Sequence, residues 1–264
     1  MFKHSEDRWP VFFILCLSAL DFSVYFTVSN PYLLGLYFYA MIIPKSIICA
    51  WNHHHQHSLT FRSAALNRVL EFFYALHTGV TTNLWVLHHV YGHHMNYLDQ
   101  SKDESRWLDK RGRLMGELRY SFLTAMTAYV RGFRVGKAHP AERRVFLVFT
   151  LITFAVVAAL VVYKPLAGFL LFVLPMMLSL WITAWATYDH HAGLDTDDPY
   201  KASYNNLNRW YNILTGNLGY HTAHHLKGGL HWSRLPKFHE QIIDSIPEEL
   251  LLDGMVIQRQ RQAA

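Results

Sequence analysis

Four apolar stretches, each about 20 residues long, constrain the fold of this chain more than any other feature. They cover residues 11–28, 32–50, 145–163 and 166–186. A helix of about 20 apolar residues crosses the hydrocarbon core of a bilayer. Asn30-Pro31 and Lys164-Pro165 are turn signals that separate the two members of each pair. The pattern predicts an all-α integral membrane protein with four transmembrane helices in two hairpins.

Composition agrees with a membrane protein. Of the 264 residues, 52% are hydrophobic and only 16% are charged, which is low for a soluble domain. Cys16 and Cys49 both lie in apolar stretches, so a disulfide framework is not expected. A cleaved signal peptide is the competing interpretation of the first stretch, but acids as well as bases precede it and no small-residue cleavage site follows. We expect a single domain spanning residues 1–264.

Basic residues predict the orientation of the hairpins. Residues 51–144 hold 13 Lys and Arg, residues 188–264 hold 7, and the segment before the first stretch holds 2. Lys164 is the basic residue of the turns, and Lys45 lies near the polar exit of the second stretch. Because basic loops remain in the cytoplasm, both termini and both long polar segments are expected there, as a cytosolic cap. This bias also accounts for the net charge of +5 without a nucleic-acid partner.

Histidine is the abnormal residue of the composition, with 18 copies that are clustered. The clusters lie at residues 53–57, 88–94, 190–191 and 221–225. All four fall in the polar segments, and two follow directly after an apolar stretch. If the second and fourth helices continue out of the membrane, they carry their histidines to a similar height. The clusters are therefore expected to converge in the cap.

The spacing of these histidines suits metal binding. His53 and His57 are four residues apart and share a helix face, and His89 and His93 repeat that spacing. On an α-helix, His94 is rotated by about 100° from His93, which directs it towards a second metal.

The last cluster has the same property, because His221, His224 and His225 lie on one helix face with two ligand directions. One ion takes only about four to six ligands, so this many histidines predicts two ions. A structural zinc site would usually include cysteine, and a metal transporter would place its ligands near the bilayer midplane. Both alternatives fit the pattern less well.

The remaining segments carry weaker signals. Thr82 or Asn83 is expected to cap a helix over residues 84–96. Residues 70–87 begin with a stretch that we place in the membrane interface or in a protein cleft, and the apolar stretch 120–130 is expected to be interfacial. Ser245-Ile246-Pro247-Glu248 resembles a capping box that would open a last amphipathic helix.

Taken as an ordered set between two hairpins, the histidines resemble those of the membrane fatty-acid desaturase and hydroxylase superfamily, which includes alkane monooxygenases. The three boxes of that family correspond here to His53–His57, His89-Val-Tyr-Gly-His93-His94 and His221-Thr-Ala-His224-His225. The resemblance covers most of the chain, from the first span to about His239. It implies a non-haem diiron centre, bound mostly by histidine, in a cytosolic catalytic cap.

The resemblance also implies a further ligand after the last span. In Tyr188-Asp189-His190-His191-Ala192-Gly193-Leu194, the alkane-hydroxylase pattern favours His191 over His190. The asparagine often found four residues earlier is Thr187 here, which puts a water-mediated ligand at that position in doubt. The implied ligands are His53, His57, His89, His93, His94, His191, His221, His224 and His225.

Other polar residues of these clusters are expected beside the ligands. His54, His55, His88 and His190 are candidates for the surroundings of the metals or of the substrate. Asp99, Asp189 and Asp195 are candidates to orient ligand rings through the second ring nitrogen.

A member of this superfamily uses two iron ions, O₂ and two electrons to oxidise an unactivated C–H bond. The second box matches alkane hydroxylases, but the short chain and the stretch from Asp99 to Trp107 look more like bacterial acyl desaturases. The predicted reaction is desaturation of a fatty acyl chain, and hydroxylation of an acyl chain, alkane or other apolar chain is the alternative. The acyl donor could be a lipid, acyl-CoA or acyl-carrier protein. Because no redox domain is fused, electrons are expected from a ferredoxin, rubredoxin or cytochrome b5.

Overall fold

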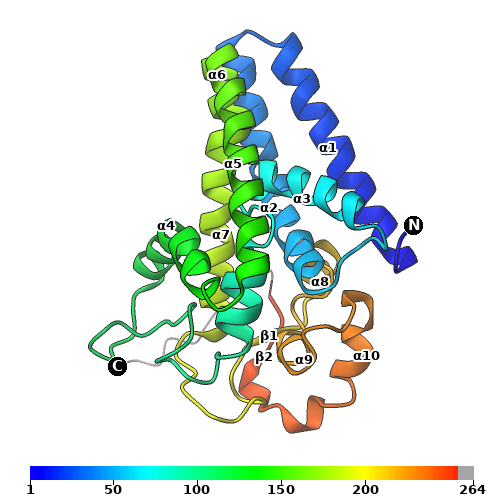
Figure 1. Ribbon diagram of the computed structural model, residues 1–264. Coiled ribbons are helices and arrows are strands. Elements are labelled where there is room, and N and C mark those ends of the chain that lie inside the picture. Colours follow the sequence, from blue (N-terminus) through cyan, green and yellow to red (C-terminus); the bar gives the residue numbers. More distant parts are fainter. Residues whose placement is uncertain (255–264) are drawn as a thin grey trace.

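The computed structural model describes residues 1–254 and is mostly helical (Figure 1). The first hairpin consists of α1 (Arg8–Thr27), which follows the 3-10 turn η1 (Ser5–Asp7), and α2 (Pro31–His57). The second consists of α5 (Pro140–Tyr163) and a continuous helical run. That run comprises α6 (Pro165–Gly168), the π-helix η3 (Phe169–Val173) and α7 (Leu174–His191). These four segments are long and apolar enough to cross a membrane, which confirms the predicted fold class.

The two hairpin turns lie together at the top of the bundle in Figure 1. Asn30 caps α2 by accepting hydrogen bonds from the backbone N–H groups of Tyr32 and Leu33. Lys164 donates to the carbonyl oxygens of Tyr25 and Phe26 at 3.0 and 2.9 Å. The lysine of one turn therefore satisfies carbonyls at the end of α1 and ties the hairpins together.

Two long helices extend beyond the apolar stretches that predicted them. α2 runs seven residues past residue 50, to His57, and α7 runs five residues past residue 186, to His191. Both extensions lie at the lower end of the bundle in Figure 1, and they carry histidines into the cap. This is the arrangement expected from the sequence.

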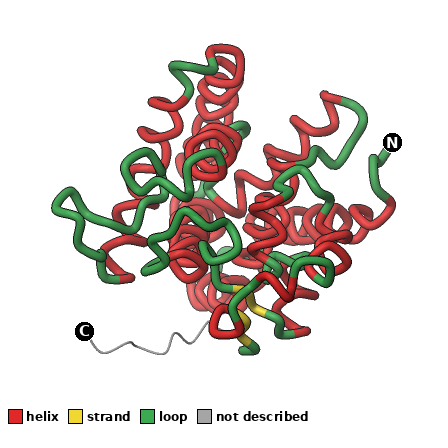
Figure 2. Tube along the Cα trace, turned by 90° about the horizontal axis from the view of Figure 1, so that it is seen from below, coloured by secondary structure: helices red, strands yellow, loops and turns green. Residues whose placement is uncertain are grey.

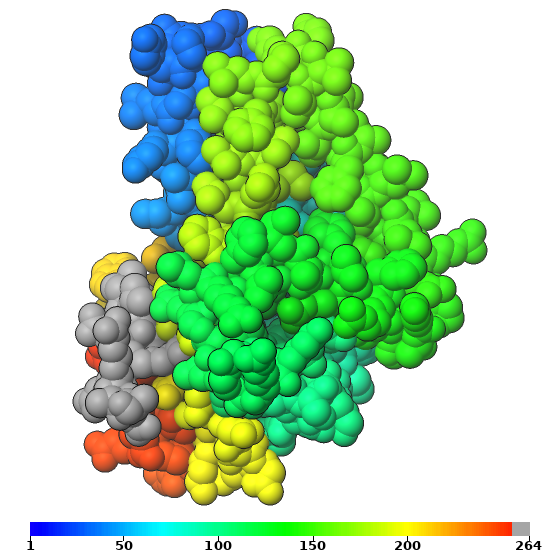
Figure 3. Space-filling view, turned by 90° about the vertical axis from the view of Figure 1, so that its left-hand side faces the viewer, coloured from blue at the N-terminus to red at the C-terminus, as the bar shows by residue number. Residues whose placement is uncertain are grey.

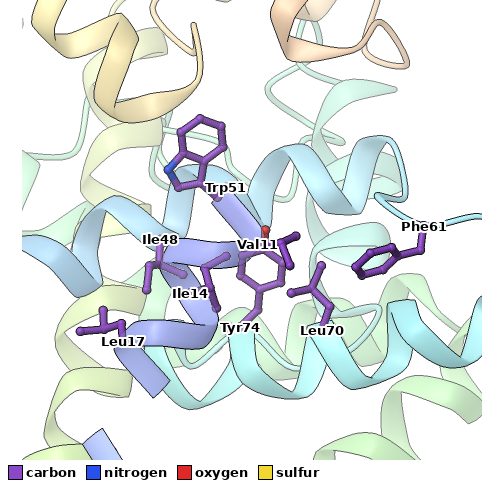
Figure 4. Close-up of a cluster of buried hydrophobic side chains, with 8 residues drawn as sticks. All are labelled: Val11, Ile14, Leu17, Ile48, Trp51, Phe61, Leu70 and Tyr74. Carbon is purple, nitrogen blue, oxygen red and sulfur yellow. The ribbon is translucent and has the colours of Figure 1, made fainter. Parts of the chain in front are cut away.

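α3 (Ala64–Thr78) crosses the lower part of the bundle and lies between α1 and α2 (Figure 1). Its apolar side chains join those of the two spans in one buried cluster (Figure 4), which consists of Val11, Ile14, Leu17, Ile48, Trp51, Phe61, Leu70 and Tyr74. The helix ends at Gly79, whose φ of 67° is left-handed and therefore favours glycine. At the start of residues 70–87, Leu70 and Tyr74 are buried against the two spans, and the location in the interface or in a protein cleft stays a prediction.

The cap lies below the spans in Figure 1, and the view from below shows its helices joined by many loops (Figure 2). Its longest helix is α4 (Glu117–Val135), and the π-helix η2 (Val86–His94) replaces the α-helix expected over residues 84–96. The other elements are β1 (Asn205–Asn206), α8 (Arg209–Thr215), α9 (His221–Leu226), η4 (Trp232–Arg234), α10 (Leu235–His239), η5 (Ile243–Ser245), η6 (Glu248–Leu250) and β2 (Leu251–Leu252). The two strands pair in parallel.

The prediction of a last amphipathic helix that begins at Ser245 is wrong for the part of the chain that the structure describes. Ser245 ends the 3-10 turn η5, and Glu248 begins the 3-10 turn η6. Pro247 holds Ile246 in an extended conformation, and the chain then enters β2, where Leu251 pairs with β1. Pairing with β1 replaces the expected helix, and residues 255–264 lie outside the described part of the chain.

The side chain of Lys45 is buried between the spans. It faces the interior of the bundle, where its Nζ is 2.8 Å from Oδ2 of Asp21 and 2.7 Å from the carbonyl oxygen of Leu171. Tyr37 donates a hydrogen bond to the same carboxylate at 2.8 Å. Lys45 keeps the position on α2 that the sequence gives it, and its side chain turns inward to an acid of the bundle rather than towards the polar exit.

Candidate metal centre

Four segments carry the clustered histidines to one place in the cap. They are the last turns of α2 and α7, the π-helix η2 and the short helix α9. α2 and α7 pack against each other and end on the same side of the bundle (Figure 1). The predicted convergence of the clusters is confirmed.

Five histidines form the first group: His53, His57, His89, His94 and His224. One nitrogen of each lies within 4.8 Å of the chosen nitrogen of every other member. Nε2 of His53 is 2.9 Å from Nε2 of His224, and Nε2 of His94 is 3.0 Å from Nε2 of His89. A convergent set of imidazoles without thiol or carboxylate suits iron, zinc, copper and nickel.

The second group lies beside the first. Nitrogens of His93, His191 and His225 lie within 4.8 Å of one another. His221 adjoins this group, with its Nε2 2.9 Å from Nε2 of His191. The structure therefore brings all nine predicted ligand residues into two neighbouring groups, and their coordination of metal stays a prediction.

The conformation of η2 corrects the expected assignment of its histidines to the two groups. In a π-helix the hydrogen bonds run from i to i+5, whereas an α-helix aligns residues four apart. His94 is five residues after His89 and lies with it in the first group, whereas His93 lies in the second. The expectation that His89 and His93 form one pair, with His94 directed to the other metal, is therefore wrong. An α-helical rotation was assumed where the chain adopts a wider helix.

α9 confirms the two ligand directions expected of the last cluster. His224 belongs to the first group and His225 to the second. The rings of His94 and His225 stack with centroids 4.0 Å apart, across the boundary between the groups. Neighbouring residues of η2 and α9 thus reach different groups, which places the groups side by side.

Several ring nitrogens of the groups are buried without a hydrogen-bond partner among the described residues. They include Nε2 of His57 and both nitrogens of His225. Buried polar atoms are normally hydrogen-bonded, so these nitrogens fit a role as metal ligands. Burial, together with neighbouring histidines, also lowers the pKa of His89, His94 and His224 well below its usual value. Neutral imidazole is the form that binds a metal ion.

An acid that the sequence analysis did not single out contacts one of the predicted ligands. The carboxylate oxygens of Asp103 lie 2.9 and 3.0 Å from Nδ1 of His93. Asp103 lies ten positions after His93 and beyond the end of η2. No helical spacing connects the two residues, so this buried carboxylate partner becomes visible only in the fold.

Two of the three acids predicted to orient ligand rings lie at the protein surface instead of beside a ligand. Asp99 lies at the protein surface and pairs with Lys102 at 2.7 Å, and this contact together with Ser101 lowers the pKa of Asp99 to about 2. Asp195 is exposed. The orienting role predicted for these two acids is wrong, because Asp99 contacts Lys102 and Ser101 instead of a ligand ring and Asp195 is exposed to solvent. Asp189 is buried in the last turn of α7 and stays a candidate.

At the end of α7, the structure distinguishes the two neighbouring histidines. His191 belongs to the second group, whereas Nδ1 of His190 is 3.0 Å from the carbonyl oxygen of Tyr204. This placement agrees with the preference for His191. Thr187 donates its hydroxyl to the carbonyl of Thr183 at 3.2 Å.

The three other candidate neighbours surround the groups without joining them. Nε2 of His54 is 3.0 Å from the carbonyl oxygen of Thr215. Nε2 of His55 is 3.2 Å from Oε1 of Glu71, on the buried side of α3. His88 is buried and stacks on Trp85, with ring centroids 5.4 Å apart. Their predicted role beside the metals or the substrate stays a prediction.

A family model described as fatty acid desaturase matches residues 29–254. The match begins just before α2. It includes α2, the whole second hairpin and all four histidine clusters. This chain belongs to the fatty acid desaturase family. Searches of curated proteins and of solved structures found no match. As a member of this family, the protein is a membrane oxidoreductase that oxidises fatty chains.

Proposed function

We propose that this fatty acid desaturase family member introduces a double bond into a fatty acyl chain. The reaction would use O₂ at a diiron centre, with electrons from a separate redox protein. The observation that supports the proposal is the convergence of nine histidines from four segments into two adjacent groups. Two groups that share a boundary fit two metal ions that act together.

The residues present fit iron. His53, His57, His89, His94 and His224 would hold one ion, and His93, His191, His221 and His225 would hold the other. Bound iron supplies the activation of O₂ that the oxidation of an unactivated C–H bond requires. In the overall reaction, –CH2–CH2–, O₂, two electrons and two protons give –CH=CH– and two molecules of water. Most of these imidazoles are buried, so a substrate carbon beside them would be shielded from bulk water.

The spans offer an apolar approach for the substrate. α2 and the run η3–α7 line a partly open hollow. Phe38, Ile42 and Leu178 are among its apolar side chains, and Lys45, Ser46 and Ser179 are its charged and hydroxyl-bearing ones. Residues three and four apart share a helix face, so the stripe through Ile42, Ser46 and Cys49 leads to His53. We infer that the tail of a fatty acyl chain lies along this face, with the carbon to be oxidised near the histidines.

The cytosolic cap would receive the remaining partners. Both termini, the histidine groups and the basic segments are proposed to face the cytoplasm, where ferredoxin, rubredoxin or cytochrome b5 could deliver electrons. In the loop before α4, Arg113 pairs with Asp109 at 2.9 Å, whereas Lys110 and Arg111 are exposed. They could bind the anionic headgroup of a lipid, acyl-CoA or acyl-carrier protein donor, or anionic membrane lipid itself.

Metal analysis and lipid profiling together test this function. We expect about two irons per purified chain, as the two histidine groups require. Lipids from cells that express the protein should contain acyl chains lighter by two hydrogen masses. His93→Ala should abolish this product while the protein remains in the membrane. Half-buried His4→Ala, whose ring stacks on His231 outside both histidine groups, should retain it.

Other results would lead to a different function. A product heavier by one oxygen mass would identify a hydroxylase, the alternative that the alkane-hydroxylase-like second box supports. One tightly held zinc per chain, with no iron, would contradict the diiron centre. Retention of the product in His93→Ala would contradict the role of this histidine.

A further inference from the structure

Asp103 occupies a buried position beside the second histidine group. It lies in the loop between η2 and α4, and its exposure is 3%. Both carboxylate oxygens are within hydrogen-bond distance of Nδ1 of His93, at 2.9 and 3.0 Å. Burying a carboxylate costs free energy unless it is paired. This pairing therefore requires explanation.

Three hydrogen bonds hold the loop around Asp103 in place. The backbone N–H of Ser105 donates to Oδ1 of Asp103 at 2.6 Å, and Tyr120 of α4 donates to the carbonyl of Ser105 at 2.8 Å. The third hydrogen bond joins the loop to η2, because the backbone N–H of Glu104 donates to the carbonyl oxygen of Gly92 at 3.1 Å. The carboxylate is therefore fixed relative to the helix that carries His93.

This arrangement defines the state of the His93 ring. A carboxylate accepts hydrogen bonds, so Nδ1 of His93 carries the hydrogen and Nε2 keeps its lone pair. Nε2 lies 3.3 Å from Nε2 of His191, inside the second group. The nitrogen that faces the group is the one that can bind a metal.

We propose that Asp103 is a positioning residue for the metal bound by the second histidine group. It holds the His93 ring in one tautomer and one orientation, and the negative charge makes the ring a stronger donor to the metal. The metal in this group would thus be held more tightly and would be harder to reduce than it would be without the carboxylate. This proposal rests on the proposed diiron centre.

Other members of the two groups have different partners at their second nitrogen. Nδ1 of His191 donates to the carbonyl oxygen of Ala202 at 2.9 Å. Nδ1 of His89 and Nδ1 of His221 have no hydrogen-bond partner among the described residues. The charge of Asp103 thus acts on the second group and makes the two metal positions unequal.

Asp103→Asn tests this role with little change of shape, since the amide oxygen still accepts a hydrogen bond from Nδ1. We expect the affinity of the second histidine group for its iron to fall by about 10- to 100-fold. A chelator should therefore remove one of the two irons, while the other is retained as in the parent. In the Mössbauer spectrum, one of the two iron signals should shift, and the reduction potential of that iron should rise. Asp103→Glu, which keeps the charge, should restore part of the parent behaviour.

Asp99→Asn is the matched control, because Asp99 lies in the same loop but at the surface. It should leave both irons and both signals unchanged. If Asp103→Asn does not fold, the smaller neutral variant Asp103→Ser takes its place. Equal retention of both irons and an unchanged spectrum in a folded neutral variant would overturn the inference. A parent protein without iron would instead contradict the proposed function, so the two failures are distinguishable.

Discussion

Asp21 and Lys45 are two charged residues inside the membrane-spanning bundle. Their exposures are 1% each, and they form an ion pair at 2.8 Å. His77 of α3 approaches the same carboxylate at 3.4 Å. The contacts join α1, α2 and α3 within an apolar environment, where an unpaired charge is costly.

Removing one charge of the Asp21–Lys45 pair should therefore destabilise the protein more than removing both charges. We expect Lys45→Met to destabilise the protein by about 3–5 kcal/mol, because Asp21 keeps a buried and uncompensated charge. The double variant Asp21→Asn with Lys45→Met should recover much of this loss. Thermal unfolding of the purified protein in detergent measures both effects. Lys137→Met, at an exposed lysine of the cap, should change little, and a double variant no more stable than Lys45→Met would contradict the argument.

At the scale of elements, α4 is distinguished by two different faces. Tyr120, Thr124 and Ala128 are buried against the protein. Leu118 and Phe122 lie on the opposite face with exposures of 72% and 60%, and this apolar face continues along the helix. Figure 3 shows α4 in green across the middle of the molecule, at the side of the cap that adjoins the spans. An amphipathic helix at this height suits the surface of the bilayer, in agreement with the interfacial location predicted for residues 120–130.

Labelling can locate this face of α4. In a Cys16→Ser background, an environment-sensitive dye on Phe122→Cys should report an apolar environment when the protein is in lipid nanodiscs. Quenchers attached to lipid should reduce its emission, because the side chain would lie among acyl chains. The same dye on Ser101→Cys, in an exposed loop, should report water. Equal emission and equal quenching at the two sites would show that lipid does not cover α4.

At the scale of the whole molecule, both hairpin turns lie at one end and all histidine groups lie at the other (Figure 1). The basic residues predict which end is cytoplasmic. In intact cells, a membrane-impermeant thiol reagent should label Tyr163→Cys, whose position in the second hairpin turn is 71% exposed. Ser101→Cys should be labelled only after the membrane is opened. The reverse pattern would invert the proposed orientation.

The sequence was sufficient for several features of this architecture, because they depend on local spacing and composition. Apolar length predicts the spans, and the positions of the histidines predict which residues converge. His53 and His57, four residues apart on a regular helix, lie in one group as expected. His191 was likewise preferred to His190 on the family pattern, and it is His191 that lies in the second group.

Tertiary structure decided the features that depend on contacts between distant segments. η2 adopts π-helical rather than α-helical geometry and exchanges the places expected for His93 and His94. Asp103 rather than Asp99 reaches His93, because the loop folds back on η2 and α4. Lys45 turns inward to an acid 24 residues away in the sequence. Spacing along one helix determines which side chains share a face, but the helix type and the buried charge pairs depend on the surrounding fold.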